Sequence, residues 1–191
     1  EDNLLSNPQC EDEFRGEKVY TTIKADGQSH TILYYNGDVR VFSRSLEKKN
    51  IDGCRFWDNA KNYNLPDKLT KLGKNIAIQS EQIGLGVQKN RMWINGHKLL
   101  VFNIKDLDTN LYYGYQEIKD FCDNNQLEMV KLIDIFEYSA DYSIDKLQQI
   151  CNNLKYNNGS PAEGLVIRCT IPKYSPTLRK MLSVKIVNQN Y

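Results

Sequence analysis

The chain has 191 residues, of which 40% are hydrophobic, enough to bury a core of the size found in single domains. It carries 25 basic and 24 acidic residues, and this near-neutral balance excludes a uniformly basic nucleic-acid-binding protein; a nucleic-acid partner would need a local basic face. No segment approaches the roughly 18 apolar residues of a membrane helix, and five cysteines without CxxC spacing favour neither a disulfide framework nor a zinc site. We therefore expect an intracellular protein with no membrane partner.

The first half of the chain has the pattern of strands joined by tight turns. Residues 1–16 are polar and predict an entry segment with at most a short helix, so the regular strands should begin near Lys18. Asp26-Gly27 and Asn36-Gly37 are typical hairpin turns, and each separates runs of β-branched and aromatic residues. The predicted strands cover residues 19–23, 30–35, 39–43, 75–81 and 99–104.

The longer helices are predicted in the second half. Residues 114–124 and 143–153 place apolar side chains at helical spacing, and strands are expected at 129–135, 164–168 and 182–187. No repeat or internal linker interrupts this order. The pattern predicts an α+β fold in which antiparallel sheets are flanked by helices, with residues 1–191 forming one domain.

Lys24 is the first candidate for chemistry. It stands in Lys24-Ala25-Asp26-Gly27, where a strand of β-branched residues stops and a turn begins. A lysine becomes a nucleophile only when its surroundings allow the ammonium to lose a proton. Taken alone, this tetrad is more typical of a solvated hairpin turn than of a catalytic site.

Three further charged residues lie beside apolar strands. Glu81 ends one strand, Glu163 precedes another, and Lys185 interrupts a third, where a lysine needs an anionic partner. Each carboxylate alone is compatible with an ordinary strand-end turn. Strands that each bring a lysine or carboxylate to one cleft are what phosphoryl chemistry on ATP requires, because cations offset phosphate charge and carboxylates hold a metal.

These residues stand in segments that resemble a known family. The chain is similar to the covalent nucleotidyltransferases, which comprise RNA ligases, DNA ligases and mRNA capping enzymes and share an ATP-grasp-like adenylation domain. The resemblance covers most of the chain, and six motifs occur in the family's order. They are Lys24-Ala25-Asp26-Gly27, Ser43-Arg44-Ser45, Ser80-Glu81-Gln82-Ile83-Gly84, Leu100-Val101-Phe102-Asn103-Ile104, Glu163-Gly164-Leu165-Val166-Ile167 and Ser183-Val184-Lys185-Ile186.

The resemblance implies a role for each motif in an ATP-dependent RNA ligase. Lys24 would attack the α-phosphorus of ATP to give lysyl-AMP and pyrophosphate, and Lys185 would contact the α-phosphate. Phe102 would stack on adenine, although its apolar surroundings are equally compatible with a core position. Arg44 would lie near the nucleotide and the RNA 5′-phosphate, unless it pairs with a local acid.

The three carboxylates are assigned to the metal and the ribose. The resemblance implies that Asp26, Glu81 and Glu163 orient the water shell of Mg²⁺ or Mn²⁺, a role that suits a hard cation which loses water reluctantly. For Asp26 and Glu81, contact with the ribose is the alternative role. His30 and His97 match no motif, and we treat both as incidental.

The segment from Glu81 to Gln88 favours one branch of the family. It resembles RNA ligases related to those of Deinococcus and Naegleria, in which an accessory oligonucleotide-binding domain precedes the catalytic one. We therefore expect such a domain N-terminal to this chain and absent from it. The expected substrates are RNA 5′-phosphate and 3′-hydroxyl ends at a nick or in a splinted duplex, joined by a monomer.

The last motif departs from the family pattern. Many RNA ligases have Lys-x-Lys there, whereas Val187 follows Lys185 at that spacing. The second cation would come from Lys180, Arg179 or Arg168, or Lys185 is itself the later lysine. The alternative functions are a DNA ligase or capping guanylyltransferase of the same fold and a catalytically silent nucleic-acid-binding module.

Overall fold

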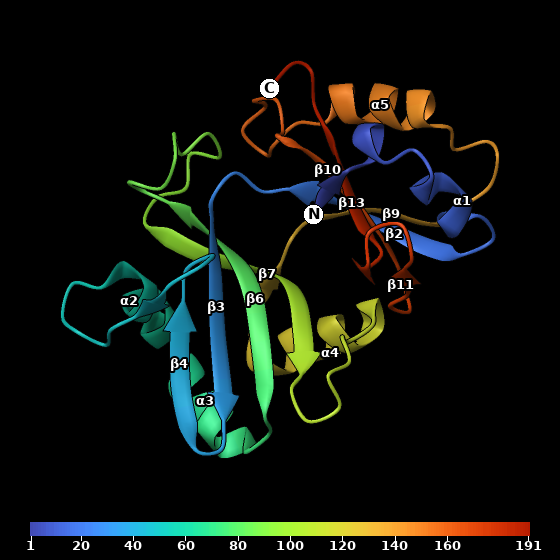
Figure 1. The fold of residues 1–191 in the computed structure, drawn as a ribbon. Coiled ribbons are helices and arrows are strands. Elements are labelled where there is room, and N and C mark those ends of the chain that lie inside the picture. The colour runs from blue at the N-terminus through green and yellow to red at the C-terminus, as the bar shows by residue number, and fades with distance from the viewer. The chain divides into compact units, whose positions relative to one another are not determined.

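A computed structural model describes residues 1–191, and the chain forms two compact units (Figure 1). Unit 1 comprises Glu1–Ala25, Gly114–Gln116 and Val130–Tyr191, and unit 2 comprises Asp26–Tyr113 and Glu117–Met129. Each unit has its own sheet and its own hydrophobic core. No helix is long and apolar enough to cross a membrane. The expectation that residues 1–191 form one domain stays a prediction.

Unit 1 is built on a five-stranded sheet with the order β1-β13-β10-β2-β9. All neighbouring strands are antiparallel except β1 and β13. The helix α5 begins after Ser143, whose hydroxyl caps the backbone N–H of Lys146. The elements are β1 (Asp2–Asn3), a 3₁₀ turn η1 (Leu4–Ser6), α1 (Cys10–Phe14), β2 (Lys18–Lys24), β9 (Leu132–Glu137), α5 (Ile144–Asn153), β10 (Gly164–Cys169), β13 (Ser183–Val187) and a small hairpin of β11 (Tyr174–Ser175) with β12 (Lys180–Met181).

The unit 1 sheet has two different faces because successive strand residues point to opposite sides. Leu165, Ile167 and Ile186 pack into a core with Phe14 of α1 and Leu147 of α5. Both helices therefore cover the same face. The alternate residues of β10 and β13 point to the other face.

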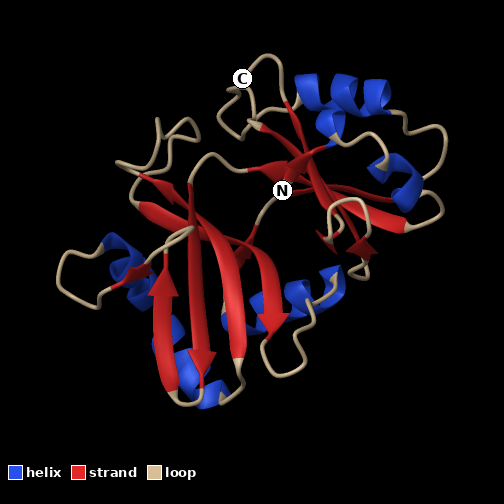
Figure 2. Ribbon diagram, viewed as in Figure 1, coloured by secondary structure: helices blue, strands red, loops and turns tan.

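Unit 2 is built on a six-stranded sheet with the order β5-β4-β3-β6-β7-β8, antiparallel except between β7 and β8. Trp57, Leu69 and Ile118 of three helices pack against Ile32 and Ile78 of the sheet, so the helices cover one face (Figure 2). The elements are β3 (Gln28–Tyr35), β4 (Asp38–Phe42), β5 (Glu47–Lys48), α2 (Arg55–Asn62), α3 (Leu65–Leu72), β6 (Ile76–Gly84), β7 (His97–Asp106), α4 (Tyr115–Asn125) and β8 (Glu128–Met129).

The α+β prediction, with antiparallel sheets flanked by helices, is confirmed. One predicted strand was wrong, because residues 129–135 divide between β8 and β9. The helices α2 and α3 were not predicted, since Asn64 and Pro66 together look like a loop. Pro66 instead lies in the first turn of α3, where a missing backbone N–H costs nothing, and Asn64 adopts a left-handed conformation that separates the two helices.

Candidate active site

Lys24 and Glu163 form an ion pair in unit 1. Lys24 ends β2 opposite Gly164, the first residue of β10, and Glu163 comes directly before that strand. The Lys24 Nζ donates to Glu163 Oε1 over 2.6 Å, and the two side chains are 20% and 24% exposed. Two motifs 139 residues apart in the chain thus meet at one point.

The packing of β10 against β13 explains why residue 164, which follows Glu163, is a glycine. A Cβ atom at this position would lie 2.2 Å from the backbone oxygen of Ile186 in β13, a distance that no side chain tolerates. Glycine therefore allows β13 to approach β10 closely. This approach fixes the start of β10 and, with it, the backbone of Glu163.

Tyr156 forms hydrogen bonds with the backbones of both Lys24 and Glu163. Its hydroxyl donates to the carbonyl oxygen of Lys24 over 3.0 Å and accepts from the N–H of Glu163 over 3.1 Å. The side chain is buried, which gives these hydrogen bonds a shielded environment. Tyr156 belongs to none of the six motifs, so the sequence offered no signal for it beyond the general rule that a buried tyrosine hydroxyl needs a partner.

Three cations share one face of the unit 1 sheet, opposite the hydrophobic core. Lys24 pairs with Gly164 across the strands, Val166 pairs with Lys185, and Arg168 lies two residues beyond Val166. Because alternate residues of β10 point to the same side, Lys24, Arg168 and Lys185 all project from this face. Phosphate groups are the natural ligands for such a surface.

Arg168 is the best placed of the residues considered for the second cation. Its Nε donates to Ser183 Oγ over 2.8 Å, and Ser183 stands two residues before Lys185. Lys180 instead pairs with Asp2 over 2.5 Å, and Arg179 lies in the turn before β12 with a positive φ of 54°. The guanidinium of Arg168 thus lies beside the last motif.

The partly exposed carboxylate of Glu1 lies next to these positive charges. Arg168 Nη2 pairs with Glu1 Oε1 over 2.8 Å. Desolvation raises the pKa of the Glu1 carboxyl, but nearby positive charges, of which Arg168 contributes most, outweigh that effect and hold the pKa below its ordinary value. The Glu1 carboxylate therefore lies in a locally positive environment.

In unit 2, the Asp26-Gly27 turn packs tightly against the Glu81 motif. A Cβ atom on Gly27 would lie 2.4 Å from the backbone oxygen of Gln82 and 2.8 Å from the Cγ of Glu81. Only glycine permits this contact. The turn thereby brings Asp26 next to the strand that carries Glu81, so two of the predicted carboxylates belong to one local structure.

Phe102 is the extra residue of a β-bulge. In the pairing of β6 with β7, Gln79 faces Asn103 and Ser80 faces Val101, which leaves Phe102 without an opposite residue. A bulge redirects a side chain and is common beside active sites. Phe102 is half-buried and lies outside the hydrophobic core of unit 2, which favours the stacking role over the core position.

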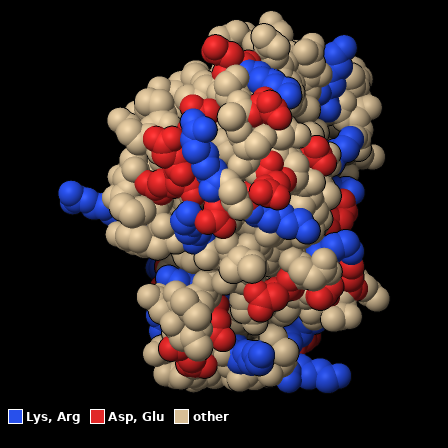
Figure 3. All heavy atoms as spheres, turned by 90° about the vertical axis from the view of Figure 1, so that its right-hand side faces the viewer, with Lys and Arg blue, Asp and Glu red and all other residues tan.

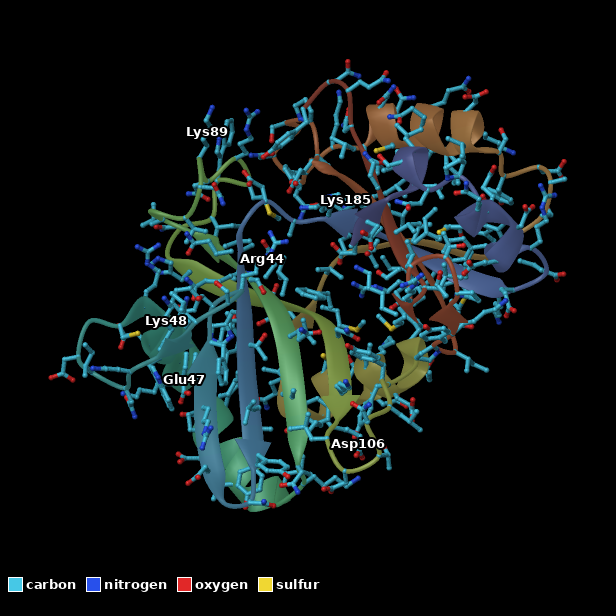
Figure 4. The ribbon with its side chains drawn as sticks, in the orientation of Figure 1. Arg44, Glu47, Lys48, Lys89, Asp106 and Lys185 are labelled. Atoms are coloured by element: carbon cyan, nitrogen blue, oxygen red, sulfur yellow. The ribbon has the colours of Figure 1, made fainter.

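Arg44 lies in the exposed turn that follows β4 (Figure 4). The backbone N–H of Ser43 donates to the Leu46 oxygen over 2.9 Å and closes this turn. Arg44 forms no ion pair, so the alternative of a local acidic partner does not hold. Nearby, the Lys48 ammonium lies 5.2 Å from the centre of the Phe56 ring.

His30 has a structural role. It is fully buried, its Nε2 donates to the Phe56 carbonyl oxygen over 3.0 Å, and its ring stacks on that of Phe56. Burial disfavours the charged imidazolium and lowers the pKa of His30 to about 4. A neutral core histidine agrees with its absence from the motifs.

The predicted site residues divide between the units. Lys24, Glu163 and Lys185 belong to unit 1. The remaining predicted site residues belong to unit 2. Lys24 and Asp26 are two residues apart, so covalent geometry alone keeps their Cα atoms within about 7 Å. In neither unit do three His, Cys, Asp or Glu side chains form a ready-made metal cluster, and the three-carboxylate metal site stays a prediction. The predicted residues of unit 2 are Asp26, Arg44, Glu81 and Phe102.

Known structures share this fold. An RNA ligase mutant from Naegleria gruberi with ATP and Mn is 23% identical, with a TM-score of 0.85, and the match covers 98% of this chain and 54% of that one. The same ligase with PPi is 24% identical, with a TM-score of 0.83 and coverages of 98% and 54%. An apo mutant of it is 25% identical, with a TM-score of 0.84 and coverages of 98% and 55%.

The chain spans about half the length of these solved ligases. No curated protein sequence matches it. The model of the family described as RNA ligase matches residues 17–187, which include all six motifs and the Lys24–Glu163 pair. The chain therefore belongs to the RNA ligase family.

Proposed function

We propose that this chain is the catalytic part of an ATP-dependent RNA ligase and that Lys24 is its nucleophile. The observation that carries the proposal is the position of Lys24, held by Glu163 on the same sheet face as Arg168 and Lys185. A nucleophile beside fixed cations is suited to attack on a phosphate, because the cations offset the charge that the amine must approach.

In the first step, the Lys24 Nζ lone pair forms a bond to the α-phosphorus of ATP, and the bond from that phosphorus to the pyrophosphate oxygen breaks. The attacking amine must be neutral, so a proton leaves Nζ, where Glu163 Oε1 is already the hydrogen-bond acceptor. AMP then passes from Lys24 to an RNA 5′-phosphate. Attack by a 3′-hydroxyl on that phosphorus forms the new phosphodiester and releases AMP.

The other residues would bind and orient the nucleotide. Lys185 is placed to neutralise phosphate oxygens, and Phe102 offers a ring on which adenine can stack. Arg168 is buried and paired with Glu1, so its role would be to hold Ser183 and the last motif in position.

The carboxylates that would orient the waters of a Mg²⁺ or Mn²⁺ ion are Asp26, Glu81 and Glu163, as the family resemblance implies. All three are partly exposed, so they can bind its waters without replacing them. When bound, the ion supplies positive charge at the phosphates.

The test is covalent labelling. The protein incubated with radiolabelled ATP and Mg²⁺ or Mn²⁺ should carry AMP through denaturing electrophoresis, whereas Lys24→Ala should carry none. Lys18→Ala is a matched control, because Lys18 is an exposed lysine at the other end of β2. Labelled Lys24→Ala, or a parent chain that accepts GTP in preference to ATP, would contradict the proposal.

The substrate and setting of the reaction are part of the proposal. We expect that a monomer seals 5′-phosphate and 3′-hydroxyl RNA ends in a nick or splinted duplex. Comparing the sealing of RNA nicks with that of DNA nicks tests the polymer, and gel filtration tests the oligomeric state.

All five cysteines are free thiols and four are buried, which supports an intracellular location. A longer chain that seals RNA faster than residues 1–191 would support an accessory domain.

A further inference from the structure

The connection between β6 and β7 in unit 2 presents an aromatic side chain among cations. We call residues 85–96 the Trp93 loop. It contains Lys89 and Arg91 but no Asp or Glu, and Trp93 is 74% exposed (Figure 4 labels Lys89). By contrast, basic and acidic side chains are intermingled over the face in Figure 3. The loop is therefore a local basic surface on a nearly neutral chain.

The Trp93 loop is held in one conformation by its own hydrogen bonds. The backbone N–H groups of Val87, Asn90 and Trp93 donate to carbonyl oxygens three residues earlier in the chain, over 3.1, 3.1 and 2.9 Å. The Asn90 side chain accepts from the N–H of Ile94 over 3.0 Å and donates to its carbonyl oxygen over 3.1 Å. Trp93 is thus presented by an ordered scaffold.

The backbone of the loop is also strained. Gln88, Asn90 and Trp93 have positive φ angles of 46°, 45° and 53°. Such angles are uncommon for residues other than glycine and are outliers for a bulky side chain such as tryptophan. Strain of this kind is concentrated at ligand-binding sites, where it holds a side chain in a position that stability alone does not favour.

One hydrogen bond connects the loop to the Asp26-Gly27 turn, and a second joins it to Arg55 of α2. Gln88 Nε2 donates to the carbonyl oxygen of Gly27 over 3.2 Å, so the loop adjoins the Asp26-Gly27 turn. Arg55 Nη1 donates to the carbonyl oxygen of Gly86 over 2.8 Å and adds a positive charge at the base of the loop. A polymer that contacts the loop therefore lies next to the Asp26-Gly27 turn.

We propose that the Trp93 loop binds the RNA substrate, with the Trp93 indole stacked on an unpaired base that adjoins the nicked or splinted duplex and with Lys89 and Arg91 contacting phosphates. This inference rests on the proposed ligase function. An exposed indole suits a base whose face is open, because the bases inside a duplex are already covered by their neighbours. The absence of acidic residues from the loop suits an anionic polymer.

Binding measurements with single substitutions test the stacking contact. The affinity for a 5′-phosphorylated single-stranded RNA should fall about ten-fold in Trp93→Ala and much less in Trp93→Phe, as expected for loss of one stacked base. Tyr35→Ala is the matched control, because Tyr35 is an aromatic residue that is 49% exposed. It lies at the end of β3 that is farther from the Asp26-Gly27 turn. Equal affinities of Trp93→Ala and the parent would overturn the proposal.

The salt dependence tests the phosphate contacts. Replacing both Lys89 and Arg91 with alanine should lower the slope of log affinity against log salt by about 1.4, since each phosphate contact on a single strand contributes about 0.7. An unchanged slope would show that these two side chains do not contact phosphates and would overturn that part of the proposal.

Intrinsic fluorescence gives an independent measurement. The chain has two tryptophans, and Trp57 is buried with its Nε1–H donating to the Lys48 carbonyl oxygen over 2.7 Å. In Trp57→Phe, emission comes from Trp93 alone, and saturating RNA should quench it. RNA binding without a change in this emission would contradict stacking, as would quenching by an acidic protein but not by RNA.

The labelling assay separates this proposal from the one on which it rests. Trp93→Ala should form lysyl-AMP at the parent rate when RNA is absent but transfer AMP to RNA about ten-fold more slowly at low RNA concentration. A parent chain that forms no lysyl-AMP overturns the ligase function itself. Normal lysyl-AMP formation with equal RNA transfer by parent and variant overturns only the role of the Trp93 loop.

Discussion

The sheet of unit 1 differs from the sheet of unit 2 in how it presents functional groups. Unit 1 turns Lys24, Arg168 and Lys185 to one face through an uninterrupted pairing of β2, β10 and β13. Unit 2 offers the carboxylate Glu81 from a regular strand but presents Phe102 through a bulge. Cations thus follow from the ordinary alternation of a strand, whereas the aromatic group requires an irregularity.

This difference agrees with the chemistry that we propose. Long, flexible lysine and arginine side chains reach phosphates from a regular sheet, because a few ångströms of error are absorbed by their rotamers. A stacking ring must lie in one plane, and a bulge fixes its direction. Substitutions in unit 1 should therefore change the rate of AMP transfer, whereas those at Phe102 should change the affinity for ATP.

Apart from the loss of the nucleophile itself, the largest effect is expected at Lys185. Lys185→Ala should slow formation of lysyl-AMP by about 100-fold, because it removes a fixed positive charge from the face that we assign to phosphate. Lys180→Ala serves as the control, since Lys180 is more exposed and pairs with Asp2. Single-turnover labelling measures both rates, and similar rates for the two variants would refute a special role for Lys185.

Phe102 should affect binding more than rate. Phe102→Ala should raise the KM for ATP about 30-fold, as expected for loss of one stacked base, while Phe102→Tyr retains the ring and most of the affinity. Phe121→Ala is the control, because Phe121 packs against the unit 2 core and its loss should lower stability without changing the KM. A lower melting temperature for Phe102→Ala with an unchanged KM would restore the core interpretation.

How far the sequence predicts this protein also differs between the units. The strand that ends at Lys24 and the strand that begins at Gly164 are evident from their β-branched residues, and the motifs around them marked both partners of the ion pair. The pairing between Lys24 and Glu163 was not predictable, because it depends on the order of strands in the sheet. Tyr156 was missed for the same reason.

In unit 2, the sequence gives no indication of the bulge at Phe102, since the run from Leu99 to Ile104 looks like a continuous buried strand. The strained backbone of the Trp93 loop was not foreseen either. Positive φ angles at Gln88 and Trp93 are imposed by the hydrogen bonds of the loop and not by local residue preference. Local patterns therefore predicted elements and motifs, but not departures from regular geometry.

His30 provides a way to destabilise unit 2 by pH. Its pKa is lowered from 6.5 to about 4, so between these values the unfolded chain binds a proton that the folded chain does not. Stability is therefore fully present above pH 6.5 and is lost as the pH falls, by about 2 kcal/mol at pH 5. Urea unfolding at pH 7 and pH 5 should show this loss in the parent and not in His30→Gln.

The control for this experiment is His97→Gln, because His97 is exposed. This variant should keep the acid sensitivity of the parent. If the two units fold as one domain, a single transition should move to lower urea in acid. Two separate transitions, of which only one depends on His30, would show that the units unfold independently.

The smallest effect is expected at Tyr156, and it tests whether the backbone of Lys24 must be held. Tyr156→Phe removes the hydroxyl that joins the Lys24 carbonyl to the Glu163 N–H, and loss of such a hydrogen-bonded bridge should slow lysyl-AMP formation about ten-fold at saturating ATP, with little change in ATP affinity. Tyr138→Phe is the matched control, since Tyr138 is also buried in unit 1 and its hydroxyl donates to Glu11 over 3.1 Å. Both variants should lose similar stability, but only Tyr156→Phe should lose rate. Equal rates in the two variants would mean that the Lys24–Glu163 pair keeps its position without this bridge.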